Sequence, residues 1–381
     1  MDPTRYKQHA LGAVRRTVGR HGYLAFHPAP LPRRLSLSAE TATLLGDAES
    51  ALGRLDGVSQ LLPNPNLLVR PYLVREAVAS TRIEGTRATI TEVFDAEAAD
   101  AELTPDLEEV LNYVRATEHA VARLATLPLS MRLVREAHAI LLDGVRGRDK
   151  QPGQVRTTQN WIGPPTSTID TATYVPVPPD ALGAALDEWE RFVNDRSTKL
   201  PVLAQCALMH YQFEAIHPFL DGNGRVGRLL IVLFLIDRGR IARPVLYVSP
   251  YLERHRDAYI GHLQAIHERG DVDPWIGFFC RAVADQAGDA VQRARRLVEL
   301  REDYRRRVTQ PNAQALIDVL FDTPVLTSRL VEQHLSVTRP TSLRLLQLLA
   351  AADILTARPT GPRGQHRWQA DDIVRVLTSE R

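Results

Sequence analysis

HPFLDGNGRVGR, residues 217–228, is the segment that decides how this chain folds. It joins two helical patterns, one over residues 202–213 and one from residue 224 to about residue 238. A glycine-containing turn that opens a helix brings backbone N–H groups and the positive end of the helix dipole to one place. The segment therefore predicts an anion site at the start of the second helix, within a mainly α fold.

The side chains of this segment favour a phosphorylated ligand that is bound with Mg²⁺. Gly222 and Gly224 have no Cβ that would keep an anion away from the backbone. Arg225 and Arg228 can make bidentate contacts to phosphate, and Asp221 offers the hard oxygen ligand that Mg²⁺ prefers. We therefore expect a di- or triphosphate with magnesium at this site.

His217 supplies a base beside the expected phosphate site. A neutral imidazole can take the proton of an incoming hydroxyl while the hydroxyl oxygen attacks phosphorus. Magnesium and arginine would stabilise the charge on the transferring group and on the departing phosphates. The alternative is a core histidine without a chemical role, but the neighbouring residues favour the base. The predicted reaction transfers a phosphorus-containing group to a hydroxyl.

Two other phosphate-binding motifs are excluded by their sequence context. Residues 222–227 fit the dinucleotide pattern GxGxxG, but that pattern needs a preceding strand and a second βα unit. Residues 205–213 have a helical pattern instead, and no alternation of strands and helices follows them. A Walker A loop is also excluded, because no Gly-Lys-Ser/Thr occurs here.

Residues 217–228 resemble the Fic-domain family motif HPFx[DE]GNGRxxR and match it at every defined position. The resemblance implies a protein adenylyltransferase, which moves AMP from ATP to a Ser, Thr or Tyr hydroxyl of a protein and releases pyrophosphate. It implies that His217 is the general base and that Asp221 binds Mg²⁺. It also implies phosphate-binding roles for the remaining motif residues. Gly222, Asn223 and Gly224 would surround the α- and β-phosphates, Arg225 would stabilise the phosphates and the motif, and Arg228 would reach the γ-phosphate.

A second motif lies far upstream, in STRIEG at residues 80–85. It fits the family's inhibitory-helix pattern [ST]xxxE[GN], at the end of a helix predicted over residues 72–83 and stopped by Gly85. The resemblance implies that Ser80 and Glu84 are inhibitory residues, with the Glu84 carboxylate paired to Arg228 in the γ-phosphate position. Because the motif precedes the catalytic segment, the resemblance implies inhibition within one chain.

Residues 144–179 break the helical pattern with turn residues and β-formers, which predicts an irregular loop with a small β-hairpin, the only strand region of the core. In related proteins a hairpin flap lies here and aligns an extended target segment by adding a strand. Trp161, Ile162 and Gly163 are candidates to face the nucleotide or the target, with an ordinary packed hairpin as the alternative. Tyr259 matches the family's aromatic position at the adenine pocket, with core packing as the alternative.

Helical patterns continue along most of the chain and end in a region that resembles a winged helix-turn-helix. That region combines three helical segments with a Pro/Gly/Arg-rich ribbon at residues 357–368. The charged run at residues 292–307 predicts a solvated helix face between domains. The expected division is residues 1–110 for an N-terminal helical region with the inhibitory motif, 111–290 for a Fic-type catalytic core, 291–310 for a linker helix and 311–381 for the winged-helix-like domain.

Composition describes an ordinary globular chain of 381 residues with a net charge of +2, so no global field draws it to nucleic acid or to a membrane. Cys206 and Cys280 suit a reduced, buried pair better than a disulfide framework or a metal site. The N-terminus lacks the pattern of a signal peptide, and the longest apolar run, residues 229–236, is too short to cross a bilayer. We expect a cytoplasmic protein without a membrane partner.

Three alternatives stay open for the function. They are a Fic relative with another donor or with phosphotransfer, a relative that removes AMP, and a DNA-binding regulator whose core senses nucleotide. Residues 311–381 contain eight arginines and seven acidic residues, a weaker basic balance than dedicated DNA readers show. The expected partners are ATP and a protein target, with the chain itself among the candidates, and protein docking or a homodimer is favoured over DNA.

Overall fold

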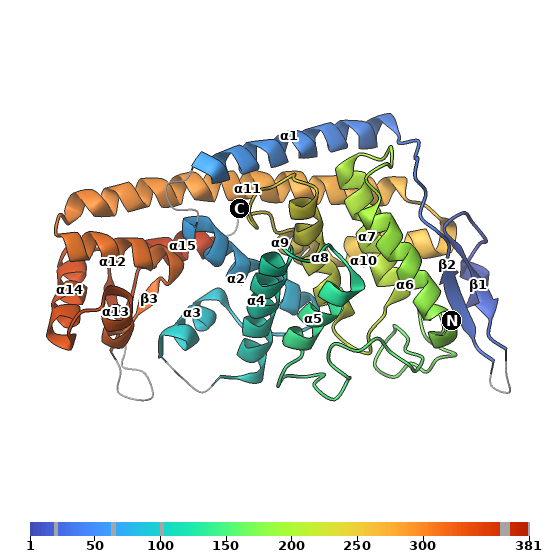
Figure 1. Ribbon diagram of the computed structural model, residues 1–381, viewed down its shortest axis with the longest axis horizontal. Coiled ribbons are helices and arrows are strands. Elements are labelled where there is room, and N and C mark those ends of the chain that lie inside the picture. The colour runs from blue at the N-terminus through green and yellow to red at the C-terminus, as the bar shows by residue number, and fades with distance from the viewer. Residues whose placement is uncertain (19–21, 62–65, 100–102, 359–365, 380–381) are drawn as a thin grey trace.

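The computed structural model describes residues 1–18, 22–61, 66–99, 103–358 and 366–379. Helices make up most of these residues, which confirms the mainly α fold (Figure 1). Two long helices, α1 (Ala39–Leu61) and α11 (Asp273–Arg307), lie side by side along one face of the molecule (Figure 1). Within the described ranges, no helix is both long enough and apolar enough to span a bilayer.

The centre of the fold is a pair of buried helices, α7 (Val202–Ile216) and α8 (Asn223–Asp237). Both are apolar on nearly all sides, which is typical of helices that lie inside a core. The free thiols of Cys206 on α7 and Cys280 on α11 are buried, as expected. The helices around this pair are α4 (Pro105–Arg123), α5 (Met131–Leu141) and α6 (Pro179–Asn194).

Helix α2 (Asn66–Ile83) brings the upstream motif to the central pair, because it packs against α4 and α8. It begins earlier than the sequence predicts, and it ends before Gly85, whose φ of +101° continues no helix. Helix α3 (Ile90–Ala99) follows it and was not predicted. The end of α2 therefore lies beside the start of α8.

The described part of the N-terminal half contains one pair of strands and, in the region of the predicted hairpin, one isolated β-bridge. Strands β1 (Gly12–Arg16) and β2 (Leu24–Pro28) form an antiparallel pair that the sequence did not predict. The predicted hairpin exists as one bridge between Ile162 and Tyr174, with N···O distances of 2.8 and 3.0 Å. We call residues 158–177 the flap. Strands of this length carry too short an alternation to stand out in the sequence.

Helix α11 passes without a break through the boundary predicted at residue 290. The prediction of a solvated face over residues 292–307 is wrong in part, because Ala294, Leu297 and Tyr304 are buried. These positions recur at helical spacing, so one stripe of a highly charged helix still faces the core. A single helix predicted near residues 250–268 is two helices, α9 (Ser249–Arg254) and α10 (Arg256–Arg269), which meet at His255.

The C-terminal region contains the three predicted helices and a small antiparallel sheet of strand order β3-β5-β4. Residues 359–365 of the predicted ribbon lie outside the described residues, and its two ends form β4 and β5. The winged-helix assignment and the four-part division of the chain stay predictions. The elements are α12 (Pro311–Asp322), β3 (Val325–Leu326), α13 (Ser328–Leu335), α14 (Arg339–Ala351), β4 (Thr356–Arg358), β5 (Arg367–Gln369) and α15 (Asp371–Thr378).

Candidate active site

His217 occupies a left-handed turn directly after α7, with φ of +50° and ψ of +62°. Few residues other than glycine adopt this conformation, so surrounding contacts must hold it. The backbone N–H of His217 donates to the Phe213 carbonyl at 3.0 Å, and its ring Nδ1 lies 3.3 Å from the Glu214 carbonyl. A carbonyl only accepts hydrogen bonds, so Nδ1 carries the proton and Nε2 has the free lone pair.

The imidazole of His217 is uncharged at neutral pH. Burial lowers its pKa to about 4, and the positive charge of Arg156 acts in the same direction. The carboxylates of Glu84 and Asp221 oppose this shift without cancelling it. The ring can therefore accept a proton at Nε2, as a general base must.

Asn223, the first residue of α8, closes the loop between the two central helices. Its side-chain Oδ1 accepts from the Phe219 N–H at 2.8 Å, and its Nδ2 donates to the Phe219 carbonyl at 2.8 Å. The amide is thus used inside the motif, and only the backbone of Asn223 is left to take part in an anion site. The family resemblance did not indicate this clamp.

Replacing Asn223 by alanine should lower the free energy of unfolding by about 2 kcal/mol, because the buried Phe219 N–H loses its acceptor and the Phe219 carbonyl keeps only the Asn160 amide as a donor. Urea unfolding measures this loss. Asn194→Ala is the matched control, since its amide donates to the carbonyls of Leu129 and Glu190 near the surface and should contribute less than about 1 kcal/mol. Equal losses in the two variants would contradict the clamp.

Gly222 and Gly224 line the first turn of α8, where the sequence predicts an anion. Gly222 has a φ of +79°, which an L side chain rarely adopts. A Cβ on Gly224 would lie 2.5 Å from Glu84 Oε1 and 3.0 Å from Arg228 Nη1. The carboxylate of Glu84 therefore lies against the positive end of α8, where a phosphate would otherwise be favoured.

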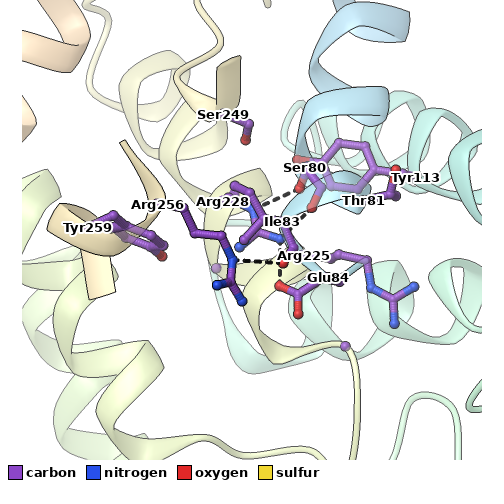
Figure 2. Close-up of polar contacts among 12 residues, drawn as sticks. Ser80, Thr81, Ile83, Glu84, Tyr113, Arg225, Arg228, Ser249, Arg256 and Tyr259 are labelled. Atoms are coloured by element: carbon purple, nitrogen blue, oxygen red, sulfur yellow. Dashed lines mark hydrogen bonds and ion pairs between the residues drawn. The ribbon is translucent and has the colours of Figure 1, made fainter. Parts of the chain in front are cut away.

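Arg228 joins α8 to the end of α2 through three hydrogen bonds (Figure 2). Its Nε donates to Ser80 Oγ at 2.9 Å, and its Nη2 donates to the Ser80 carbonyl and to Glu84 Oε1, each at 2.8 Å. The Arg228 side chain is 1% exposed and that of Glu84 is 37% exposed. The predicted pairing of Glu84 with Arg228 is confirmed as an ion pair.

The short distance between Glu84 and Arg228 determines the ionisation state of Glu84. Burial acts to raise the pKa of Glu84, but the Arg228 guanidinium outweighs burial and leaves this pKa below its usual value. Glu84 is therefore a carboxylate at neutral pH, and Arg228 has a charged partner inside the protein. Breaking this contact without a substitute would leave a buried guanidinium unpaired, which is costly.

Asp221 and Arg225 form a second charged group on the other side of the loop. Asp221 Oδ1 accepts from the Gly222 N–H at 2.6 Å and lies 3.3 Å from Arg225 Nη2. Arg225 is 1% exposed, and its Nη1 pairs with the buried Glu109 at 3.2 Å. Arg225 thus holds Asp221 from behind. Glu109 was not predicted, because nothing distinguishes one glutamate on a helix with an apolar stripe.

Asp221 fits a magnesium ion that is bound mainly through its substrate. Its side chain is 36% exposed, and a Cβ on Gly147 would lie 2.7 Å from its Oδ2, so glycine keeps the space beside this oxygen open. Among the described residues, no group of three or more His, Cys, Asp or Glu side chains could hold a metal by itself. One carboxylate together with phosphates and water is a common way to bind Mg²⁺.

His138 on α5 supports the same loop and was missed by the sequence. Its Nδ1 accepts from the Gly153 N–H at 2.8 Å, so its Nε2 carries the proton and donates to the Asp221 carbonyl at 2.9 Å. The ring stacks on Phe219 with a centroid distance of 3.7 Å. Burial lowers the pKa of His138 to about 4, which keeps this tautomer neutral. A lone histidine in a helical pattern gives no signal of such a role.

Tyr259 is buried in the structure. Its ring is 4% exposed and lies near the rings of His210 and Trp275. Its hydroxyl lies 2.8 Å from His210 Nε2, and His210 Nδ1 lies 2.9 Å from the Gly227 carbonyl, so the tyrosine donates. The ring is therefore packed in the core, and the adenine contact stays a prediction.

All three predicted flap residues are open to solvent. Trp161 is 44% exposed and Ile162 is 40% exposed. The Trp161 Nε1–H donates to the Ser167 carbonyl at 3.1 Å, which fixes the indole at the edge of the flap. Gly163 serves the packing of the flap, since a Cβ there would lie 2.6 Å from Ser167 Oγ.

Comparison with family models finds two matches along this chain. Residues 42–122 match the Fic/DOC family N-terminal model, and residues 128–235 match the Fic/DOC family model. The protein adenylyltransferase Fic of Drosophila grimshawi is 27% identical over 208 residues, which are 52% of this chain and 39% of the relative. The protein adenylyltransferase fic-1 of Caenorhabditis elegans is 30% identical over 144 residues, 38% of this chain and 24% of the relative. The chain thus spans about two fifths or less of these curated relatives.

Solved structures share the fold. A Fic family protein from Desulfovibrio desulfuricans G20 superposes with a TM-score of 0.58 at 21% identity, over 88% of this chain and 97% of that one. A fragment of Fic-1 from C. elegans superposes with a TM-score of 0.53 at 20% identity, over 69% of this chain and 74% of that one.

Proposed function

This chain carries the N-terminal region and the domain of the Fic/DOC family, and we propose that it is a protein adenylyltransferase that moves AMP from ATP to a hydroxyl of a protein. The names of the curated relatives support this reaction class. The observation that carries the proposal is the placement of a neutral imidazole, His217, a few residues before the anion-binding start of α8.

In the proposed reaction the target hydroxyl oxygen attacks the α-phosphorus of ATP. A bond forms between this oxygen and phosphorus, and the bond from phosphorus to the bridging oxygen of the β-phosphate breaks, which releases pyrophosphate. The hydroxyl proton moves to Nε2 of His217, because Nδ1 already donates to the Glu214 carbonyl. The backbone N–H groups at the start of α8 would stabilise the charge on the phosphates.

Asp221 would hold Mg²⁺, which when bound neutralises phosphate charge. The buried pair of Arg225 and Glu109 keeps the Asp221 carboxylate in place for that contact. The His138 hydrogen bond to the Asp221 carbonyl fixes the backbone of the same residue. These contacts restrict the carboxylate before any substrate arrives, which is the preorganisation that phosphoryl and nucleotidyl transfer depend on.

We also propose that the chain is autoinhibited by Glu84. Arg228 is the cation on α8 that would bind the γ-phosphate, and the Glu84 carboxylate already uses it. ATP can place its γ-phosphate at Arg228 only when the Glu84 carboxylate moves away from this guanidinium. Ser80 adds two acceptors for the same guanidinium, its hydroxyl and its carbonyl, and so strengthens the closed arrangement.

The proposed function is tested with ATP labelled at either the α- or the γ-phosphate, in the presence of Mg²⁺. The chain and its Glu84→Gly variant are incubated alone and with lysate, and modified peptides are identified by mass spectrometry. We expect the α label, and not the γ label, on protein. Label from γ-labelled ATP would show phosphotransfer instead, and no label on any protein with either nucleotide would reject the proposal.

A further inference from the structure

Arg156, in the loop after α5, is buried to 2% exposure and lies against the turn that contains His217. Its Nε donates to the His217 carbonyl at 2.9 Å, and its Nη2 donates to the Ile216 carbonyl at 3.3 Å. Its backbone N–H donates to the Pro218 carbonyl at 2.9 Å. One residue therefore binds the carbonyls of three consecutive residues at the end of α7.

These carbonyls need such a partner. The last carbonyls of a helix receive no hydrogen bond from an N–H of the same helix, and the helix dipole favours a cation near them. The side chain of Arg156 meets main-chain carbonyls at each contact described for it, which is unusual for a buried charge. Burial lowers the pKa of Arg156 to about 10, so the guanidinium stays charged at neutral pH.

The same guanidinium also contacts both ends of the flap. Its Nη2 donates to the Val177 carbonyl at 2.5 Å, and its Nη1 donates to the Thr158 carbonyl at 3.4 Å. Close by, the Asn160 amide donates to the Phe219 carbonyl at 2.8 Å. The two ends of the flap and the turn of His217 thus share one planar group with fixed donor directions.

We propose that Arg156 is a positioning residue that holds the left-handed turn of His217 and links this turn to both ends of the flap. The part of this proposal that concerns catalysis rests on the proposed adenylyltransferase function. The structural part stands without it, because the turn, the imidazole and the flap can be observed in the protein without nucleotide.

The charge of Arg156 also acts on the imidazole. The charged or titratable groups that influence His217 are Arg156, Glu84 and Asp221, together with the neighbouring His267. Of these, Arg156 lowers the pKa of His217, while the two carboxylates raise it. Removing the guanidinium should therefore move the imidazole midpoint up toward the ordinary value of about 6.5.

The test compares Arg156→Met and Arg156→Lys with the matched control Arg238→Met. Arg238 is also largely buried, and its Nη2 donates to the carbonyls of Val193 and Asp195, away from the turn of His217. Protein labelled with ¹³C-histidine is followed by NMR, and the His217 resonance is assigned by its loss in His217→Ala. AMP transfer is then measured in the Glu84→Gly background.

We expect Arg156→Met to shift the His217 resonance, raise its titration midpoint and lower kcat by about 100-fold, the loss typical of a misplaced catalytic group. The KM for ATP should change by less than about twofold, since the start of α8 is untouched. Lysine cannot reach the same set of carbonyls as the planar guanidinium. Arg156→Lys should therefore give a shift of the His217 resonance and a loss of kcat that lie between those of the unmodified chain and Arg156→Met. Arg238→Met should lose thermal stability and leave the His217 resonance in place.

Two results would overturn the proposal: an unchanged His217 resonance and midpoint in folded Arg156→Met, or equal changes in Arg238→Met. If Arg156→Met does not fold, Arg156→Lys decides on the same two readouts. If the Glu84→Gly parent transfers no AMP, the proposed function fails, but the NMR comparison still decides whether Arg156 positions His217.

Discussion

Replacing Glu84 by glycine is expected to raise self-modification with Mg²⁺ and ATP by about 10- to 100-fold, the gain available when an almost fully closed site is released. The carboxylate of Glu84 lies 2.8 Å from Arg228 Nη2 and against Gly224 in the first turn of α8. Its removal frees both the guanidinium and the helix start for phosphate. Incorporation of label from α-labelled ATP measures the rate, and calorimetry measures the gain in ATP affinity.

Two further variants test whether inhibition comes from the Glu84 carboxylate or from the rigidity of the end of α2. Arg82→Gly places the same flexible residue on the last turn of α2 but keeps Glu84, so its rate should stay near that of the unmodified chain. Glu84→Gln keeps a hydrogen-bond acceptor for Arg228 without the charge and should give an intermediate rate. Equal labelling of the unmodified chain and Glu84→Gly would contradict the proposal that Glu84 inhibits the chain.

The second large effect is expected at His217. In the Glu84→Gly background, His217→Ala should lower the rate of AMP transfer by about 10²- to 10⁴-fold, the usual contribution of a general base. ATP binding should persist, because the helix start and Arg228 are intact. His255→Ala, an exposed histidine between α9 and α10, is the control and should leave the rate unchanged. Full activity of His217→Ala would exclude its role as the base.

The pH dependence follows from the protonation state of the same ring. Burial and the charge of Arg156 lower the pKa of His217 to about 4, so the base is present above this pH and lost below it. We expect kcat/KM to change little from about pH 6 to about pH 8 and to fall as the pH approaches 4. An acid limb centred near the ordinary histidine pKa of about 6.5 would contradict this assignment.

The sequence predicted most helices and the turn between α7 and α8. Both follow from glycine positions and apolar periodicity, which depend only on residues close together in the chain. It missed β1 and β2, whose strands are too short for a clear alternation, and it missed the break at His255. For Tyr259 it left an adenine contact and core packing open, and in the structure the ring is buried beside His210. Burial of a single aromatic residue depends on neighbours that are remote in the chain.

The residues of HPFLDGNGRVGR by themselves determined that a turn, a histidine and the start of a helix adjoin, since these groups are neighbours in the chain. They also predicted an anion site at that helix start. Resemblance to a known motif added the pairing of Glu84 with Arg228 across 144 positions, and the structure confirmed it. Only the tertiary structure decided that Glu109 supports Arg225, that His138 supports Asp221, and that Arg156 binds the turn of His217. Local spacing sets backbone geometry, but the partner of a buried side chain is set by how distant helices and loops pack together.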